Sequence, residues 1–449
     1  MTKKLILFIS VFYSVVAFSQ DKTYSFSLEE AVSFALDSNY TALNAKRDIA
    51  KAIKKKWETT ATGLPQINGN VSYNNNLKQP VSLIPSEFFG GEPGTFSPVV
   101  FGTKQTTSAT ATLEQLIFDG SYLVGLQAAK AFLDYSENAN EKTQLEVRKG
   151  VINAYGSVLL AEELVAIFKK NKENLEKNLF ETQKIYENGL TEEENVEQLE
   201  VTLLDIETNL NNAERMEGIA KQMFNASLGI DINAKVILTQ NLDELTKENI
   251  QLTTLTEDLS IENNVDYKIA YNLTEQRSLE MKLEKSRALP RLSAFVNYGT
   301  QANSDSFTFL DNDQIWYQSS ILGVSMNIPI FSSGMRGART QQARIALDQS
   351  KTQLEETIQN VKLQFDSAKS DYQFSIDKYE NAKKNLALAE RIENKNQIKF
   401  TEGLSTSFDL RQAQIQLYSA QQQYFQSMLD VINAKTQLET VLNTVQFNN

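Results

Sequence analysis

The chain has 449 residues, a net charge of −12 at neutral pH, and neither cysteine nor histidine. The negative charge argues against nucleic acid as a partner. Without these two residue types the chain can form no disulfide, no thiolate or Ser-His-Asp catalytic site, and no His/Cys zinc site. Carboxylate pairs remain possible, but the acidic residues mostly fall on solvated helix faces. We find no catalytic constellation and expect neither an enzyme nor a bound cofactor.

The first 19 residues have the features of a secretory signal peptide. Lys3 and Lys4 precede an apolar run that ends at Ala17, and small residues stand three and one positions before a cut at Gln20. The run is too short for a membrane anchor. Removing residues 1–19 removes two lysines and changes the net charge from −12 to −14. We expect no other segment to be apolar enough for a membrane helix.

The first half of the remaining chain predicts a helix followed by two strands. Ser27 is a candidate N-cap and Glu30 is at the capping-box position, so a helix is predicted from 27 to about 60. Alternation of apolar and polar residues predicts strands at about 65–77 and 104–118. Between them, four prolines and four glycines predict a long irregular loop over 78–103.

A long helical hairpin is predicted near the C-terminal end. The segment 334–402 contains no proline, and at ~1.5 Å per residue its helix would be about 100 Å long. Its heptad seam has a bulky row (Phe365, Tyr372, Tyr379, Leu386, Phe400) and a small row (Ala368, Ser375, Ala382, Ala389). Gly403 and Leu404 then reverse the chain into a second seam, predicted as a helix over 405–444.

The same order of elements occurs twice, which indicates an internal duplication. A shift of 214 residues relates Gly403-Leu404 to Gly189-Leu190 and the late seams to earlier ones. The first repeat is predicted at 20–230, with helices at 27–60, 120–188 and 191–228. A mixed segment with a short strand at 236–238 occupies 231–258. The second repeat is predicted at 259–449, with helices at 259–287, 334–402 and 405–444 and strands at 290–300 and 316–330.

The four predicted strands suit a membrane better than a soluble core. Their apolar faces include Gly69, Ala109, Ala111 and Ala294, which would bury little surface against a helix. Their length is about the 9 to 11 residues that tilted membrane strands need. Tyr73, Tyr298 and Trp316 could lie at the lipid–water boundary. Since four strands cannot close a barrel and open edges are not tolerated in hydrocarbon, the chain must oligomerise.

These features resemble the TolC-like outer membrane efflux family over essentially all of the chain after residue 19. The resemblance rests on Leu116–Gly120 with Pro329–Gly334, on the Leu-Pro strand starts, and on Gly-Leu turns followed by Asn195-Val196 and Asp409-Leu410. It implies a mainly α fold with a membrane β-barrel portion, in which three copies give four strands each to one twelve-stranded barrel. Long antiparallel coiled-coil helices would continue this barrel as an α-barrel through the periplasm.

The resemblance also implies a function. The homotrimer would be a passive exit duct in the outer membrane, for a tripartite efflux or type I secretion system. Its partners would be outer-membrane lipid, a periplasmic adaptor and an inner-membrane pump. Drug, metal-ion and protein export share such a duct, and the sequence does not separate them. The sequence departs from the family pattern in two places. The first repeat has Asn195 at the position where the second repeat keeps the acidic Asp409, and the loop over 78–103 is long.

Two groups of candidate site residues follow. In the family the hairpin tips meet the adaptor, which implies contacts at Gly189, Leu190, Gly403 and Leu404. Glycine also simply permits the chain reversal, whereas an exposed leucine favours a partner. Candidates for a periplasmic gate are Glu390, Glu393 and Asn394, because Glu393 interrupts the apolar row where a polar lining could face the lumen. The alternative is an ordinary solvated helix face.

Other protein classes fit less well. A periplasmic adaptor would need a β-rich lipoyl-like module, and no such repeat is visible. A secreted, flagellin-like coiled-coil filament gives no reason for alternating strands at equivalent places in both halves.

Overall fold

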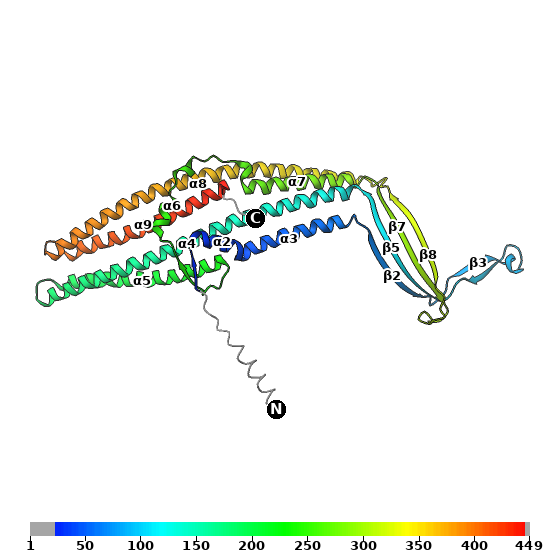
Figure 1. Cartoon of the computed structure of the whole chain (residues 1–449), viewed down its shortest axis with the longest axis horizontal. Helices are drawn as coiled ribbons and strands as arrows, with labels where there is room; N and C mark the ends of the chain where they lie inside the picture. Colours follow the sequence, from blue (N-terminus) through cyan, green and yellow to red (C-terminus); the bar gives the residue numbers. More distant parts are fainter. Residues whose placement is uncertain (1–22, 445–449) are drawn as a thin grey trace, which may run out of the picture. The chain divides into compact units, whose positions relative to one another are not determined.

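The computed structural model describes residues 23–444, so the expected signal peptide lies outside the described residues. The chain divides into two compact units, each drawing on both halves of the sequence (Figure 1). Within the described part, the first unit comprises 23–49, 136–271 and 353–444, and the second comprises 50–135 and 272–352. The expected mainly helical fold is confirmed. The division into two sequence repeats stays a prediction.

Two antiparallel helical hairpins make up most of the first unit, and the first turns of their long helices belong to the second unit. Helix α4 (Gly120–Glu187) is followed by α5 (Glu193–Leu228), and α8 (Met335–Thr401) is followed by α9 (Ser407–Leu442). The predicted seams are buried or half-buried, because heptad spacing keeps one face of each helix against its neighbours. The buried seam positions include Val151, Val158, Val165, Phe224, Tyr372, Tyr379, Leu410, Val431 and Leu438.

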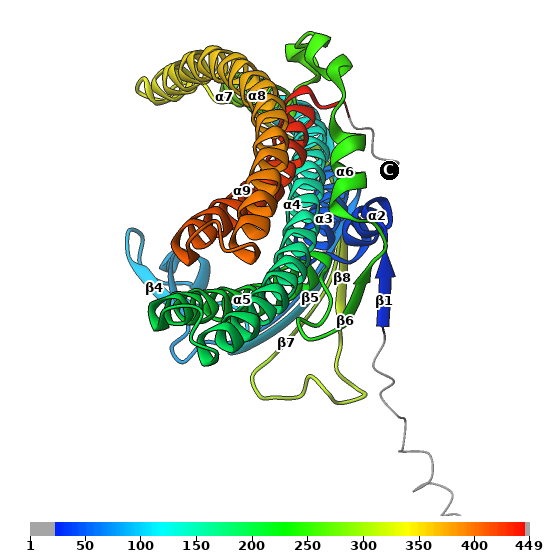
Figure 2. The ribbon, with the colours of Figure 1, turned by 90° about the vertical axis from the view of Figure 1, so that its left-hand side faces the viewer.

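A small αβ layer packs on α4 in the same unit (Figure 2). Strand β1 (Thr23–Phe26) pairs in parallel with β6 (Lys235–Leu238), which confirms the short strand expected at 236–238. Helices α2 (Leu28–Ser38) and α6 (Leu242–Asn249) flank this pair, followed by the 3-10 turns η2 (Leu252–Thr256) and η3 (Ile261–Asn263). Their apolar residues join the seam residues of α4, α8 and α9 in one core.

The helix predicted over 27–60 is wrong at Asn39, where it divides into α2 and α3 (Tyr40–Ala61). Asn39 has an extended backbone, and its side-chain oxygen accepts a hydrogen bond from the Thr41 N–H at 2.8 Å. Its side-chain amide donates to the Ser227 carbonyl at 2.8 Å. The break therefore caps α3 and also satisfies a carbonyl at the C-terminal end of α5.

The second unit contains one four-stranded antiparallel sheet in the order β2-β5-β7-β8. Its strands are β2 (Gln66–Asn75), β5 (Gln105–Asp119), β7 (Arg291–Ser304) and β8 (Tyr317–Asn327), close to the four predicted strands. The register aligns Ile67 with Leu113, Leu113 with Val296, and Val296 with Leu322. Because these partners share a face, one row across all four strands is apolar.

The irregular loop predicted over 78–103 is wrong. Strands β3 (Val81–Pro85) and β4 (Phe96–Val100) form a hairpin there, with a 3-10 turn η1 (Ser86–Phe89) between them. In Figure 1 this hairpin extends from the end of the sheet that is remote from the helices. Proline is tolerated in a two-stranded ribbon because each strand has a free edge, so the Pro-rich composition misled the sequence prediction.

Two smaller corrections concern helices. Helix α7 (Val265–Ser286) begins six residues later than predicted, because Asn264 caps it by accepting from the Asp266 N–H at 2.9 Å. The expectation of no further membrane-helix candidate was too strict. Within residues 23–444, α4 is long and apolar enough to cross a membrane by length and composition alone. Half of its most apolar stretch is buried in the chain.

Candidate functional site

The turns between the long helices have the same geometry in both hairpins. Gly189 and Gly403 have φ values of 74° and 72°, which only glycine adopts without strain. In each turn the glycine N–H donates to a carbonyl three residues back, and the following leucine N–H donates to one five residues back. This is the Schellman arrangement. Leu190 and Leu404 follow the glycines and are each 78% exposed, so both tips present one uncovered leucine.

The residues that differ between the two tips have different local roles. Asp409 accepts a hydrogen bond from the Thr406 N–H, and the Thr406 hydroxyl accepts one from the Asp409 N–H, both at 3.2 Å. This capping box begins α9, and its hydrogen bonds hold the pKa of Asp409 below its usual value. Asn195 instead accepts from the hydroxyl of Ser407 in the other hairpin. The acid of the second repeat is thus used as a helix cap, a role that Asn195 does not take.

Neutral amide pairs connect the two hairpins. Asn171 of α4 donates to Gln421 of α9 at 2.9 Å, and both side chains are buried. Asn178 of α4 and Gln397 of α8 exchange two hydrogen bonds, of 3.0 and 3.1 Å. Each buried polar group has its partner on the other hairpin, so separating the hairpins would leave unpaired amides.

The three gate candidates do not share one environment. Glu390 and Asn394 are exposed, whereas Glu393 is half-buried. Burial raises the pKa of Glu393 above its ordinary value. Burial, and secondarily the charge of Glu393, raise the pKa of Tyr418 on α9. Glu393 therefore lies close to α9, and a polar lining formed by all three residues stays a prediction.

Replacing Glu393 by Gln is expected to stabilise the protein at neutral pH but not in acid. A carboxyl whose pKa is raised in the folded state contributes its stability below the unfolded pKa, near 4.5, and loses it as the pH rises through the folded pKa. Glutamine does not ionise, so the variant does not lose this stability as the pH rises. The thermal unfolding midpoints of E393Q and the parent should coincide at pH 4 and separate at pH 7.5. Equal midpoints at both pH values would contradict the burial of this carboxyl.

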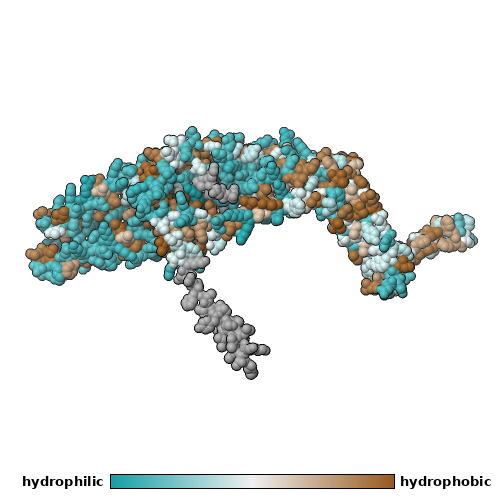
Figure 3. Space-filling view, viewed as in Figure 1, coloured by the Kyte–Doolittle hydropathy of each residue, from teal (hydrophilic) through white to brown (hydrophobic). Residues whose placement is uncertain are grey.

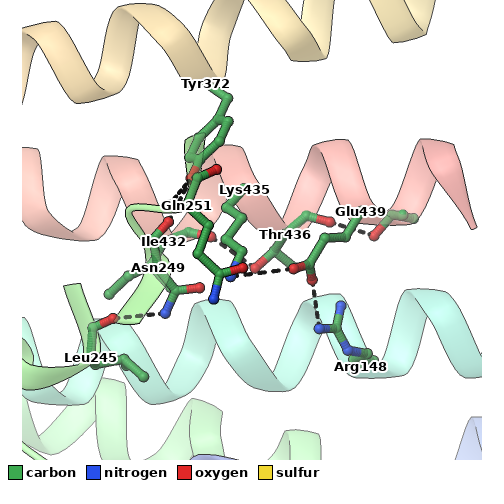
Figure 4. Close-up of polar contacts among 10 residues, drawn as sticks. Arg148, Leu245, Asn249, Gln251, Tyr372, Ile432, Lys435, Thr436 and Glu439 are labelled. Carbon is green, nitrogen blue, oxygen red and sulfur yellow. Dashed lines mark hydrogen bonds and ion pairs between the residues drawn. The ribbon is translucent and has the colours of Figure 1, made fainter. Parts of the chain in front are cut away.

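A polar cluster connects three helices to the αβ layer of the first unit (Figure 4). Arg148 of α4 forms an ion pair of 2.7 Å with Glu439 of α9, and Lys435 lies 3.5 Å from the same carboxylate. Tyr372 of α8 donates its hydroxyl to the Asn249 carbonyl at 2.6 Å and accepts from the Gln251 N–H at 2.9 Å. The segment after α6 is thereby fixed to α8 through one buried phenol.

Replacing Tyr372 by Phe is expected to destabilise the first unit by about 1–3 kcal/mol, because two part-buried hydrogen bonds, each worth about 0.5–1.5 kcal/mol, are lost. Tyr372 is fully buried, so the ring itself keeps its packing. The free energy of unfolding in urea measures the effect. Tyr40→Phe is the matched control, since Tyr40 is 66% exposed and should change stability by less than about 0.5 kcal/mol.

The sheet of the second unit has one apolar and one polar face, and its apolar face is uncovered. Ile67, Val71, Leu322, Val324 and Met326 are all exposed large apolar residues. The alternate positions on β2 are Asn68, Asn70, Ser72 and Asn74. Figure 3 shows hydrophobic residues over the part of the sheet next to the helices. Strands β2 and β8 have no partner on their outer edges among residues 23–444.

Sequence reasoning found the tips and the strands but missed the contacts between distant segments. The amide pairs Asn171–Gln421 and Asn178–Gln397 join positions about 220 to 250 residues apart, and no local pattern indicates them. The β3–β4 hairpin could have been found from its two short β-branched and aromatic runs. In the described part of the chain, no group of three or more acidic side chains is arranged to hold a metal ion.

Comparison with known proteins agrees with this arrangement. Alkaline protease secretion protein AprF of Pseudomonas aeruginosa is 22% identical over 353 residues, which are 74% of this chain and 68% of that protein. The crystal structure of CusC matches with a TM-score of 0.73 and 18% identity, covering 92% of this chain and 91% of that one. The outer membrane protein VceC of Vibrio cholerae matches with a TM-score of 0.70 and 15% identity, covering 92% and 95%.

The model of one protein family, described as outer membrane efflux protein, matches residues 34–229 and 258–444. These ranges contain both helical hairpins and all four strands of the sheet. The chain therefore belongs to the outer membrane efflux protein family and is an outer-membrane protein.

Proposed function

We propose that three copies of this chain form a passive exit duct through the outer membrane. Each copy gives β2, β5, β7 and β8 to one twelve-stranded barrel, and the hairpins α4–α5 and α8–α9 line an α-helical barrel in the periplasm. The duct catalyses no reaction and binds no cofactor. A periplasmic adaptor connects it to an inner-membrane pump, which supplies the energy and selects the cargo for efflux or secretion.

The observation that carries the proposal is the open, four-stranded sheet with an uncovered apolar face. An exposed apolar face of this extent is stable against lipid, whereas water would disfavour it. The free edges of β2 and β8 cannot remain unpaired in hydrocarbon. Pairing β2 of one copy with β8 of the next satisfies both edges, and three copies give the twelve strands of a closed barrel.

The two tips are the proposed contact with the adaptor. Gly189 and Gly403 set the turn, and Leu190 and Leu404 supply the exposed apolar side chains. The region around Glu390, Glu393 and Asn394 is the proposed constriction. The amide pairs between the hairpins support this assignment, because an opening movement of the hairpins would have to break them.

Mass and conductance of the purified protein test the proposal. The protein is extracted from outer membranes with detergent, its mass in the complex is measured, and it is then inserted into planar bilayers. A trimer with stepwise, voltage-driven conductance is expected. A monomer, or a trimer without conductance, would exclude the duct and favour a coiled-coil structural or adaptor protein without a barrel.

A further inference from the structure

The β3–β4 hairpin has one face made only of apolar residues. The register pairs Val81 with Val100, Leu83 with Pro98, and Pro85 with Phe96, so these six side chains share a face. All six are exposed, with Leu83 at 66% and Phe96 at 62%. Figure 3 shows the corresponding hydrophobic surface along the hairpin. The opposite face is mixed: Ser82 pairs with Val99 and Ile84 with Ser97, and Ile84 and Val99 are half-buried.

This ribbon is held to its own chain mainly at its base. The Asn76 N–H donates to the Lys104 carbonyl at 2.9 Å, and the Lys104 N–H donates to the Asp305 carboxylate at 3.0 Å. The six face positions remain exposed. An isolated two-stranded ribbon is only marginally stable in water, and soluble surfaces rarely expose such a continuous apolar strip. The apolar face therefore requires another surface that buries it.

The hydrocarbon of the membrane does not reach the hairpin. Strand β5 has 15 residues, so it is about 50 Å long and rises about 38 Å at a tilt of ~40°. This already exceeds the ~25 Å apolar band of an outer-membrane barrel. The hairpin begins beyond the paired end of β2 and β5, at Val81. It also lacks the cluster of basic residues that anionic head groups attract, since residues 77–104 contain two lysines and two glutamates.

We propose that the apolar face of the β3–β4 hairpin docks on a second copy of this chain. The hairpin continues β2, an edge strand of the sheet, whose free side must meet another copy in a closed barrel. Interfaces between permanently associated copies are apolar and poor in charge, as this face is, whereas occasional partners meet more polar surfaces. This inference rests on the proposed trimer and adds a contact between copies outside the barrel wall.

Photo-cross-linking in intact outer membranes tests the inference. The photoreactive residue benzoylphenylalanine replaces Leu83 or Phe96 on the apolar face, and Ser82 on the opposite face serves as the control. We expect adducts of twice the chain mass, containing only this protein, from positions 83 and 96 and a yield at least about tenfold lower from position 82. Adducts with lipid or with a different protein, or equal yields from both faces, would overturn the inference.

The mass of the complex in detergent separates this inference from the proposed function. A trimer that gives no adduct between copies rejects the hairpin contact and leaves the duct intact. A monomer rejects the duct itself. A further variant, Leu83→Ser with Phe96→Ser, should lower the temperature at which the trimer dissociates, while Ser82→Ala should leave it unchanged. An unchanged dissociation temperature in the double variant would also count against the contact.

Discussion

Lysine in place of Val71 is expected to prevent stable assembly in the outer membrane. Val71 lies in the middle of β2, on the apolar face, and is 76% exposed. A lysine on the lipid face near the bilayer centre costs about 2–4 kcal/mol, so three copies cost about 6–12 kcal/mol together. This approaches the whole stability of a typical folded protein. The heat-sensitive trimer band of outer-membrane fractions measures the loss.

Asn70→Lys is the matched control for this prediction. Asn70 is the neighbouring residue on β2, and side chains alternate between the faces of a strand. In the proposed barrel Asn70 faces the aqueous lumen, so its lysine variant should assemble in normal amounts. If Val71→Lys and Asn70→Lys assemble equally well, the apolar face does not contact lipid.

Serine in place of both tip leucines is expected to uncouple the trimer from its adaptor. Leu190 and Leu404 are largely exposed, so their loss should change the stability of the free protein by less than about 0.5 kcal/mol. Burying each leucine against a partner is worth about 1.5–3 kcal/mol. The double variant should therefore bind the adaptor at least about 100-fold more weakly, and export should fall with it.

Co-purification of the adaptor with the trimer after chemical cross-linking in whole cells measures this effect. Leu204→Ser is the control, because Leu204 of α5 is 62% exposed but lies away from the turn. The control should retain adaptor binding. Adaptor recovery that is undiminished in the double variant, with the trimer intact, would show that the tip leucines are not the contact.

The long helices, their seams and the faces of the four strands can be predicted from local residue patterns. Heptad spacing fixes which side of a helix is apolar, and Tyr372, Tyr379 and Leu438 are buried as that spacing predicts. Alternation of apolar and polar residues likewise fixes which face of β2 and of β8 is apolar. The tip turns were also predictable, because the Gly189 and Gly403 conformations favour glycine at those positions. These are local properties, and nearby residues suffice to state them.

The contacts that join distant segments could not be predicted in this way and become visible only in the folded chain. The break at Asn39 depends on a carbonyl of α5 that is 188 residues away, and the amide pairs between the hairpins depend on which helix faces join. The sheet order β2-β5-β7-β8 and the β3–β4 register likewise depend on pairing between strands. Hydrogen bonds across such separations carry no local periodicity, because each partner satisfies the other only after the chain has folded.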